Sequence, residues 1–114
     1  NRNKAKDVSW ALPYLSTEAK LAKYFVENDW VLDDVDYTNF SNVEPGDILF
    51  WDSDTVQNND FMNCSHTSIC VGKDDKGNNL IIEGNDEKVI RKIKITDRNI
   101  NNLLFVGRID LSKR

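Results

Sequence analysis

The residues best suited to chemistry in this chain are its only histidine, His66, and two polar residues further along, Glu83 and Asn85. The segments 66–72 and 80–85 are both predicted to be β-strands, and a short turn-rich join separates them. If the two segments pair as a hairpin, the start of the first strand lies beside the end of the second. We therefore expect the imidazole of His66 to lie next to the Glu83 or the Asn85 side chain.

An imidazole in that position is suited to act as a general base. A carboxylate or amide that accepts a hydrogen bond from one ring nitrogen fixes the tautomer, and the other nitrogen can then take a proton from a nucleophile. The alternative is a structural histidine bonded to a backbone carbonyl, with Glu83 at a solvated edge position.

Metal and cofactor sites are not expected. The chain has no second histidine and no Cys-x-x-Cys pair, which disfavours zinc. The acidic stretch 52–60 lacks the fifth-position oxygen ligand and the sixth-position glycine of an EF-hand loop, because Val56 and Gln57 stand there.

The N-terminal part is predicted to be helical over about residues 7–30. Pro13 favours a break after the first turns, and Ser16 is a candidate N-cap for a second helical segment. An apolar stripe then follows at helical spacing, formed by Leu21, Ala22, Phe25 and Val26. This stripe predicts a helix that covers the core and carries no chemistry.

The rest of the chain, about residues 45–110, is predicted to form an antiparallel sheet. Short apolar segments separated by turn residues indicate about five strands, at 48–51, 67–71, 80–82, 89–95 and 103–109. The connections are too short for helical crossovers, so we expect a meander. The fold class is therefore α+β, with N-terminal helices packed on the sheet, in a single domain of residues 1–114.

Composition and charge exclude several classes of protein. The net charge is −4 and the basic residues are scattered, so no nucleic-acid surface is expected. The densest basic stretch, 91–94, alternates with apolar residues and is expected on the solvated face of a strand. No apolar run approaches the roughly 20 residues of a membrane-spanning helix, so a soluble chain without a membrane span is expected. Cys64 and Cys70 are too few for a disulfide framework.

Three motifs, in order, resemble the C-terminal half of a CHAP domain, the cysteine, histidine-dependent amidohydrolase/peptidase branch of the NlpC-type, papain-like cell-wall hydrolases. The first is PGDILFW at residues 45–51, and the second is HTSICVG at 66–72, which is similar to the family's H-x-x-I-x-V-G strand. The third is EGN at 83–85, similar to E-x-N. The likeness covers roughly residues 40–110, and it implies a papain-like half-domain.

This resemblance implies a function. Such proteins cut amide bonds of bacterial peptidoglycan, as N-acetylmuramoyl-L-alanine amidases or peptide endopeptidases, and many are phage endolysins or secreted autolysins. The implied partners are peptidoglycan stem peptides, and the implied location is the bacterial cell wall. The implied roles are general base for His66, orienting residue for Glu83 and accompanying polar residue for Asn85. Trp51 or Phe50 is expected to line the substrate groove.

The family's nucleophile is missing from this chain. It is a cysteine at the start of a helix upstream of the PGD strand, where the helix dipole and a nearby imidazole lower the thiol pKa. Residues 7–10 read Asp-Val-Ser-Trp, no cysteine precedes Cys64, and the pattern would put Lys4 near the nucleophile position.

Three interpretations follow from this absence. The chain begins after the cysteine, or it is a catalytically inactive variant that binds wall peptides or a protein partner, or Cys64 serves instead. Cys64 would share a face with His66 in a regular strand, but it lacks a helix N-terminus and oxyanion donors. We expect the chain of residues 1–114 by itself to be inactive.

Overall fold

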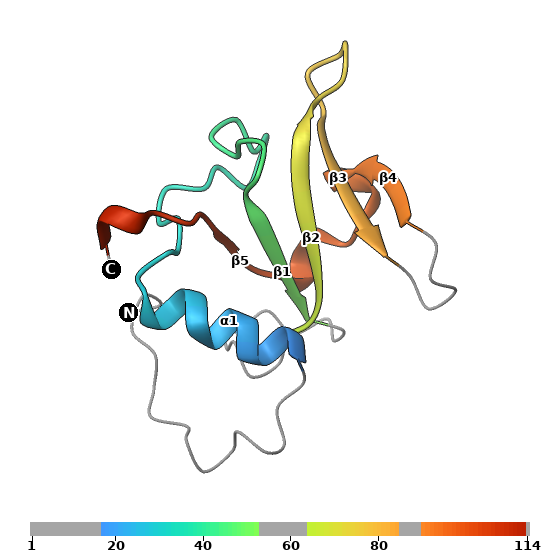
Figure 1. The fold of residues 1–114 in the computed structure, drawn as a ribbon. Coiled ribbons are helices and arrows are strands. Elements are labelled where there is room, and N and C mark those ends of the chain that lie inside the picture. The colour runs from blue at the N-terminus through green and yellow to red at the C-terminus, as the bar shows by residue number, and fades with distance from the viewer. Residues whose placement is uncertain (1–16, 53–63, 85–89, 114) are drawn as a thin grey trace.

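The computed structural model describes residues 17–52, 64–84 and 90–113, and Figure 1 shows their arrangement. In these ranges one helix packs against a five-stranded antiparallel sheet. The elements are α1 (Thr17–Glu27), β1 (Ile48–Asp52), β2 (Cys64–Lys73), β3 (Asn79–Gly84), β4 (Ile90–Lys94) and β5 (Leu103–Gly107), with the short 3₁₀ turns η3 (Ile95–Asp97), η4 (Ile100–Asn102) and η5 (Leu111–Lys113). The α+β class is confirmed. Of the helices predicted over 7–30, the described residues contain one, and residues 7–16 lie outside them.

The helix α1 forms because small and apolar residues recur on one face. Its buried residues are Ala19, Ala22, Phe25 and Val26, which lie three or four positions apart or next to one another. Leu21 was expected in this stripe but is 39% exposed. The helix ends where Asp29 takes a positive φ of 58°, a backbone conformation that a helix cannot continue through.

The strand order is β4-β3-β2-β1-β5, so the sheet is not a meander. The first four strands follow one another as predicted, but β5 pairs with β1 and not with β4. All five residues of β5 are buried, whereas four of the five in β4 are exposed. The fifth strand therefore returns to the edge of the sheet where both of its faces are covered. On its outer side, the backbone N–H of Leu32 donates a hydrogen bond to the carbonyl oxygen of Val106.

The two faces of the sheet carry different cores. On one face α1 packs against Phe50 and Phe105, whose rings stack with centroids 4.5 Å apart. On the other face lies a second cluster, which includes Leu49, Trp51, Cys70, Ile81 and Val106 and is completed by Phe40 and Val43 from the segment before β1. Ser68 and Glu83 belong to this second face, because Trp51 donates a hydrogen bond to Ser68 and Ser68 donates one to Glu83. The site therefore lies on the face opposite the helix.

Candidate functional site: a buried glutamate beside His66

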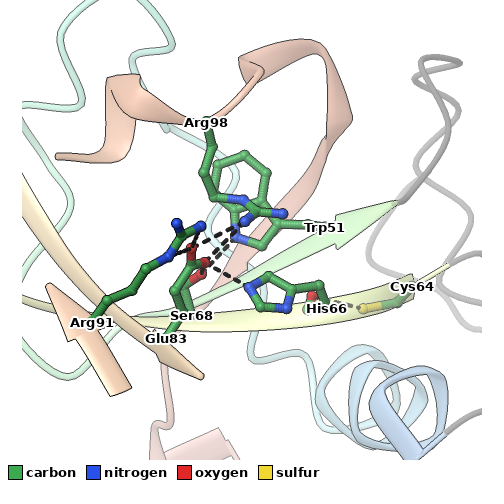
Figure 2. A network of polar contacts seen from close by, with 7 residues as sticks. All are labelled: Trp51, Cys64, His66, Ser68, Glu83, Arg91 and Arg98. Carbon is green, nitrogen blue, oxygen red and sulfur yellow. Dashed lines mark hydrogen bonds and ion pairs between the residues drawn. The ribbon is translucent and has the colours of Figure 1, made fainter. Parts of the chain in front are cut away.

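The side chains of His66 and Glu83 meet between neighbouring strands. The β2–β3 register pairs Ile69 with Ile82, which sets Ser68 opposite Glu83 and His66 one diagonal step away. His66 Nε2 lies 2.6 Å from Glu83 Oε2, as Figure 2 shows. The predicted juxtaposition of the two side chains is confirmed, and the catalytic role of each stays a prediction.

The contact determines which ring nitrogen carries the proton. An ionised carboxylate can only accept a hydrogen bond, so His66 Nε2 must donate to Glu83. The neutral imidazole is then unprotonated at Nδ1, and this nitrogen makes no hydrogen bond to another residue in the described ranges. The His66 side chain is 28% exposed. A partly exposed imidazole whose orientation is fixed by a carboxylate is the arrangement that a general base requires.

Glu83 is held by four side chains. Its carboxylate is fully buried, and Ser68 Oγ donates to Oε2 at 2.9 Å. Arg91 donates to Oε1 from Nε at 3.0 Å and from Nη2 at 2.7 Å. Arg98 Nη1 lies 3.1 Å from each of the two carboxylate oxygens. Both oxygens of Glu83 are therefore surrounded by donors.

These partners keep Glu83 ionised. Burial by itself would raise the pKa of the carboxyl, but hydrogen bonds from His66, Arg91 and Ser68 and the positive charge of Arg98 lower this pKa to about 2. At neutral pH the carboxylate is thus a fixed negative charge beside the imidazole. It orients the ring and does not itself exchange protons.

The two arginines reach Glu83 from different parts of the fold. Arg91 stands directly opposite Glu83 in the β3–β4 ladder. Its stretch was expected on the solvated face of a strand, and the Arg91 side chain is 49% exposed. Alternation nevertheless puts Arg91 on the same face as Ile93, which packs on the second core cluster, so its guanidinium reaches Glu83. Arg98 lies between the turns η3 and η4, and no sequence signal pointed to it.

Trp51 supports the network from within the core. The Arg98 guanidinium carbon lies 4.9 Å from the centroid of the Trp51 ring, close enough for a cation–π interaction. The Trp51 indole donates to Ser68 Oγ at 3.0 Å. Because the Ser68 hydroxyl accepts from Trp51, its single hydrogen is available to Glu83.

The expectation that Phe50 or Trp51 lines a groove needs correction. Both side chains are fully buried. Phe50 belongs to the helix-side core, on the face away from His66. Trp51 pairs with His66 in the β1–β2 ladder and shares its face, but its ring lies beneath Arg98 and is not on the surface.

Neither cysteine of the chain is placed to act with His66. A register shift between Trp51 and Asp52 pairs Asp52 with Cys64, so Cys64 and His66 do not share a face as a regular strand would require. Cys64 lies in the helix-side core, and burial raises the pKa of its thiol to about 12. Burial also raises the pKa of Cys70, which lies inside the second core cluster. The interpretation that Cys64 replaces the nucleophile is therefore wrong.

Several predicted positions lie outside the described residues. They are Asn85, Lys4, the stretch 7–10 and most of the acidic stretch 52–60. Where the chain is described, no three or more His, Cys, Asp or Glu side chains gather in a way that could hold a metal ion. No helix in the same ranges is long and apolar enough to cross a membrane.

Comparison with known proteins gives no family assignment. No protein-family model matches the chain, and no curated protein and no solved structure is significantly similar to it.

Proposed function

We propose that His66 and Glu83 are the general base and the orienting residue of a cysteine-type hydrolase that cuts amide bonds in the peptides of the bacterial cell wall. The observation that carries this proposal is the 2.6 Å contact between His66 Nε2 and Glu83 Oε2, which leaves Nδ1 as the basic nitrogen. The order and spacing of the PGD, H-x-x-I-x-V-G and E-x-N motifs support the same reading. The proposed nucleophile is a cysteine thiol supplied from outside these 114 residues.

The proposed reaction uses this geometry in two steps. His66 Nδ1 takes the proton of the thiol, the thiolate attacks the carbonyl carbon of the scissile amide, and the imidazolium returns the proton to the leaving amine. A water molecule, deprotonated by the same nitrogen, then hydrolyses the resulting thioester and releases the acid. Glu83 holds the ring in place throughout.

The experiment uses the parent protein with its natural upstream sequence. Hydrolysis of purified peptidoglycan is followed by the appearance of free amino groups. His66→Ala is expected to lower kcat by at least about 10²-fold, the size of a general-base contribution. Lys20→Ala, an exposed change on the outer face of α1, is the matched control and should leave the rate unchanged. An upstream sequence without a cysteine, or full activity in His66→Ala, would contradict the proposal.

A second candidate function is a module that binds cell-wall peptides or a protein partner without cleaving anything. The observation in its favour is that both cysteines of the chain lie buried away from the imidazole of His66. Calorimetric titration of the chain with soluble muropeptides separates the two functions. A binding module should bind them with an affinity that changes less than about twofold in His66→Ala, and its parent protein should release no amines.

A further inference from the structure

The network around Glu83 contains more positive than negative charge. One carboxylate accepts from two guanidinium groups, so the cluster carries a net charge of +1 when His66 is neutral. Among the described residues no other carboxylate pairs with Arg91 or Arg98. The surplus stands out because the whole chain has a net charge of −4.

The cluster also contains more donors than acceptors. Every nitrogen of a guanidinium is a donor, yet Arg91 uses only Nε and Nη2 and Arg98 uses only Nη1 toward Glu83. Within the part of the chain that the structure describes, Arg98 Nε is buried without a hydrogen-bond partner. Leaving a buried donor unsatisfied costs free energy, so an additional acceptor at this place would be stabilised.

Both arginine side chains are partly accessible to a ligand. The Arg91 side chain is 49% exposed and that of Arg98 is 22% exposed. The His66 ring, which contacts the same carboxylate, is also partly exposed. In Figure 2 the two arginines and the histidine approach Glu83 from different directions. Because Glu83 fixes Arg91 and Arg98, their open nitrogens are held in place before any ligand arrives.

We propose that Arg91 and Arg98 form a subsite for a free carboxylate of the peptide that His66 acts on. This inference rests on the proposed function, which it deepens by naming a feature of the substrate. A guanidinium matches the planar, two-oxygen geometry of a carboxylate, and such charge-assisted pairs are the strong ones. The carboxylate completes the charge balance of the network and brings the neighbouring amide beside His66.

The experiment measures binding of two matched peptides to the chain of residues 1–114 by NMR titration at low salt and pH 7. One is N-acetyl-alanyl-alanine, and the other is the same dipeptide with a C-terminal amide. The acid is expected to bind about tenfold tighter than the amide, because a charge-assisted pair forms only with the acid. Equal affinities would overturn the proposal, as would tighter binding of inorganic phosphate than of the peptide acid.

Two variants locate the subsite. Arg91→Gln is expected to weaken binding of the acid about fivefold, and Arg91→Lys should recover part of this loss because it restores the charge. Lys92→Gln is the matched control, since it removes the same charge from the neighbouring position of β4, which faces the other side of the sheet. It should change the affinity less than twofold. Equal effects of Arg91→Gln and Lys92→Gln would overturn the proposal.

A failure of the carboxylate subsite can be distinguished from a failure of the proposed hydrolase function. Preferential binding of the acid by a protein whose parent does not hydrolyse peptidoglycan supports the subsite and refutes the hydrolase. A parent protein that cleaves peptide acids and their amides with the same KM refutes the subsite and supports the hydrolase.

Discussion

Two buried acids in this protein have different surroundings. Asp47, before β1, forms a two-point ion pair with Arg108, with Nε–Oδ1 and Nη2–Oδ2 both at 2.8 Å, and the backbone N–H of Glu44 donates to Oδ2. Glu83 contacts two arginines and His66. The Asp47 pair joins the start of β1 to the end of β5, its neighbour in the sheet. The Glu83 network has surplus charge, surplus donors and an accessible imidazole.

The comparison shows that the residues of one motif have separate roles. In Pro45-Gly46-Asp47, Gly46 has a positive φ of 92°, which favours glycine, and Asp47 binds Arg108 just after β5. These residues position β1 and anchor β5, and none of them is among the hydrogen-bond partners of Glu83 in the described ranges. Glu83, which contacts the imidazole, comes instead from β3, and its other partners come from β2, β4 and the segment after η3.

The largest expected loss of stability comes from removing the carboxylate of the Glu83 network. Glu83→Ala removes the acceptor that Arg98 has among the described residues and the partner of Ser68, so the free energy of unfolding should fall by about 3–5 kcal/mol. Urea unfolding at pH 7 measures it. Glu27→Ala breaks the exposed pair with Lys23 and should cost less than about 1 kcal/mol. A loss in Glu83→Ala no larger than in this control would show that the network does not hold the sheet together.

Acid should weaken the Glu83 network in a defined pH range. The pKa of Glu83 is about 2 in the fold against an ordinary value of 4.5. Below its ordinary pKa the unfolded chain therefore binds a proton that the folded chain does not. The stabilisation is complete above about pH 5 and is lost as the pH falls toward 2, amounting to at most about 3 kcal/mol.

Unfolding in urea at a series of pH values tests this expectation. The wild-type chain should lose stability between pH 5 and 2 more steeply than Glu83→Gln, which has no carboxyl at that position. Glu27→Gln is the control and should keep the wild-type slope. Identical slopes in Glu83→Gln and the wild type would contradict the assigned pKa.

A double-mutant cycle compares the two acids directly. The Asp47–Arg108 pair is expected to couple by about 2 kcal/mol, because the carboxylate is buried and both oxygens face one guanidinium. The Glu83–Arg91 pair should couple by less than about 1 kcal/mol, because Arg91 is half exposed and Arg98 stays on the same carboxylate. Thermal unfolding of the single and double alanine variants measures both. A stronger coupling for Glu83–Arg91 than for Asp47–Arg108 would contradict this expected difference between the two acids.

The smallest expected loss of stability from a single substitution in this network comes from removing the Ser68 hydroxyl, which lies between Trp51 and Glu83. Ser68→Ala removes one donor from Glu83 and leaves the buried Trp51 indole without its acceptor, so it should cost about 1–2 kcal/mol. Thr67→Ala on the same strand is the control, because Thr67 faces the other side of the sheet. Equal losses in the two variants would show that the Ser68 bridge contributes nothing of its own.

Much of the fold could be predicted from local patterns. The apolar stripe around Phe25 predicted α1, and the short apolar segments predicted the strands, because burial imposes a period on each kind of element. The hairpin predicted that His66 lies beside the end of the next strand, but the face taken by Glu83 depends on a register shift between Cys70 and Gly72 that the sequence did not indicate. The place of β5 did not follow, because a strand after a long connection can return to either edge of the sheet.

The rest of the site depended on contacts between residues that are distant in the sequence. Arg91 could have been found by extending the register of the β3–β4 hairpin to its direct partner, Glu83. Arg98 could not, because it lies outside any strand and reaches Glu83 from a turn. The register shift beside Cys64 was equally invisible, since one inserted residue changes the face of a side chain without changing the pattern of residue types.

The sequence by itself determined the element types, the first four strands in order and the position of His66 beside the strand end that carries Glu83 and Asn85, because each depends on periodicity or on a short hairpin. Only the tertiary structure decided that two arginines share this carboxylate, that Trp51 lies beneath them and that Cys64 faces the other core. The physical reason is that these contacts join segments brought together by packing of the whole sheet, and local spacing carries no information about them.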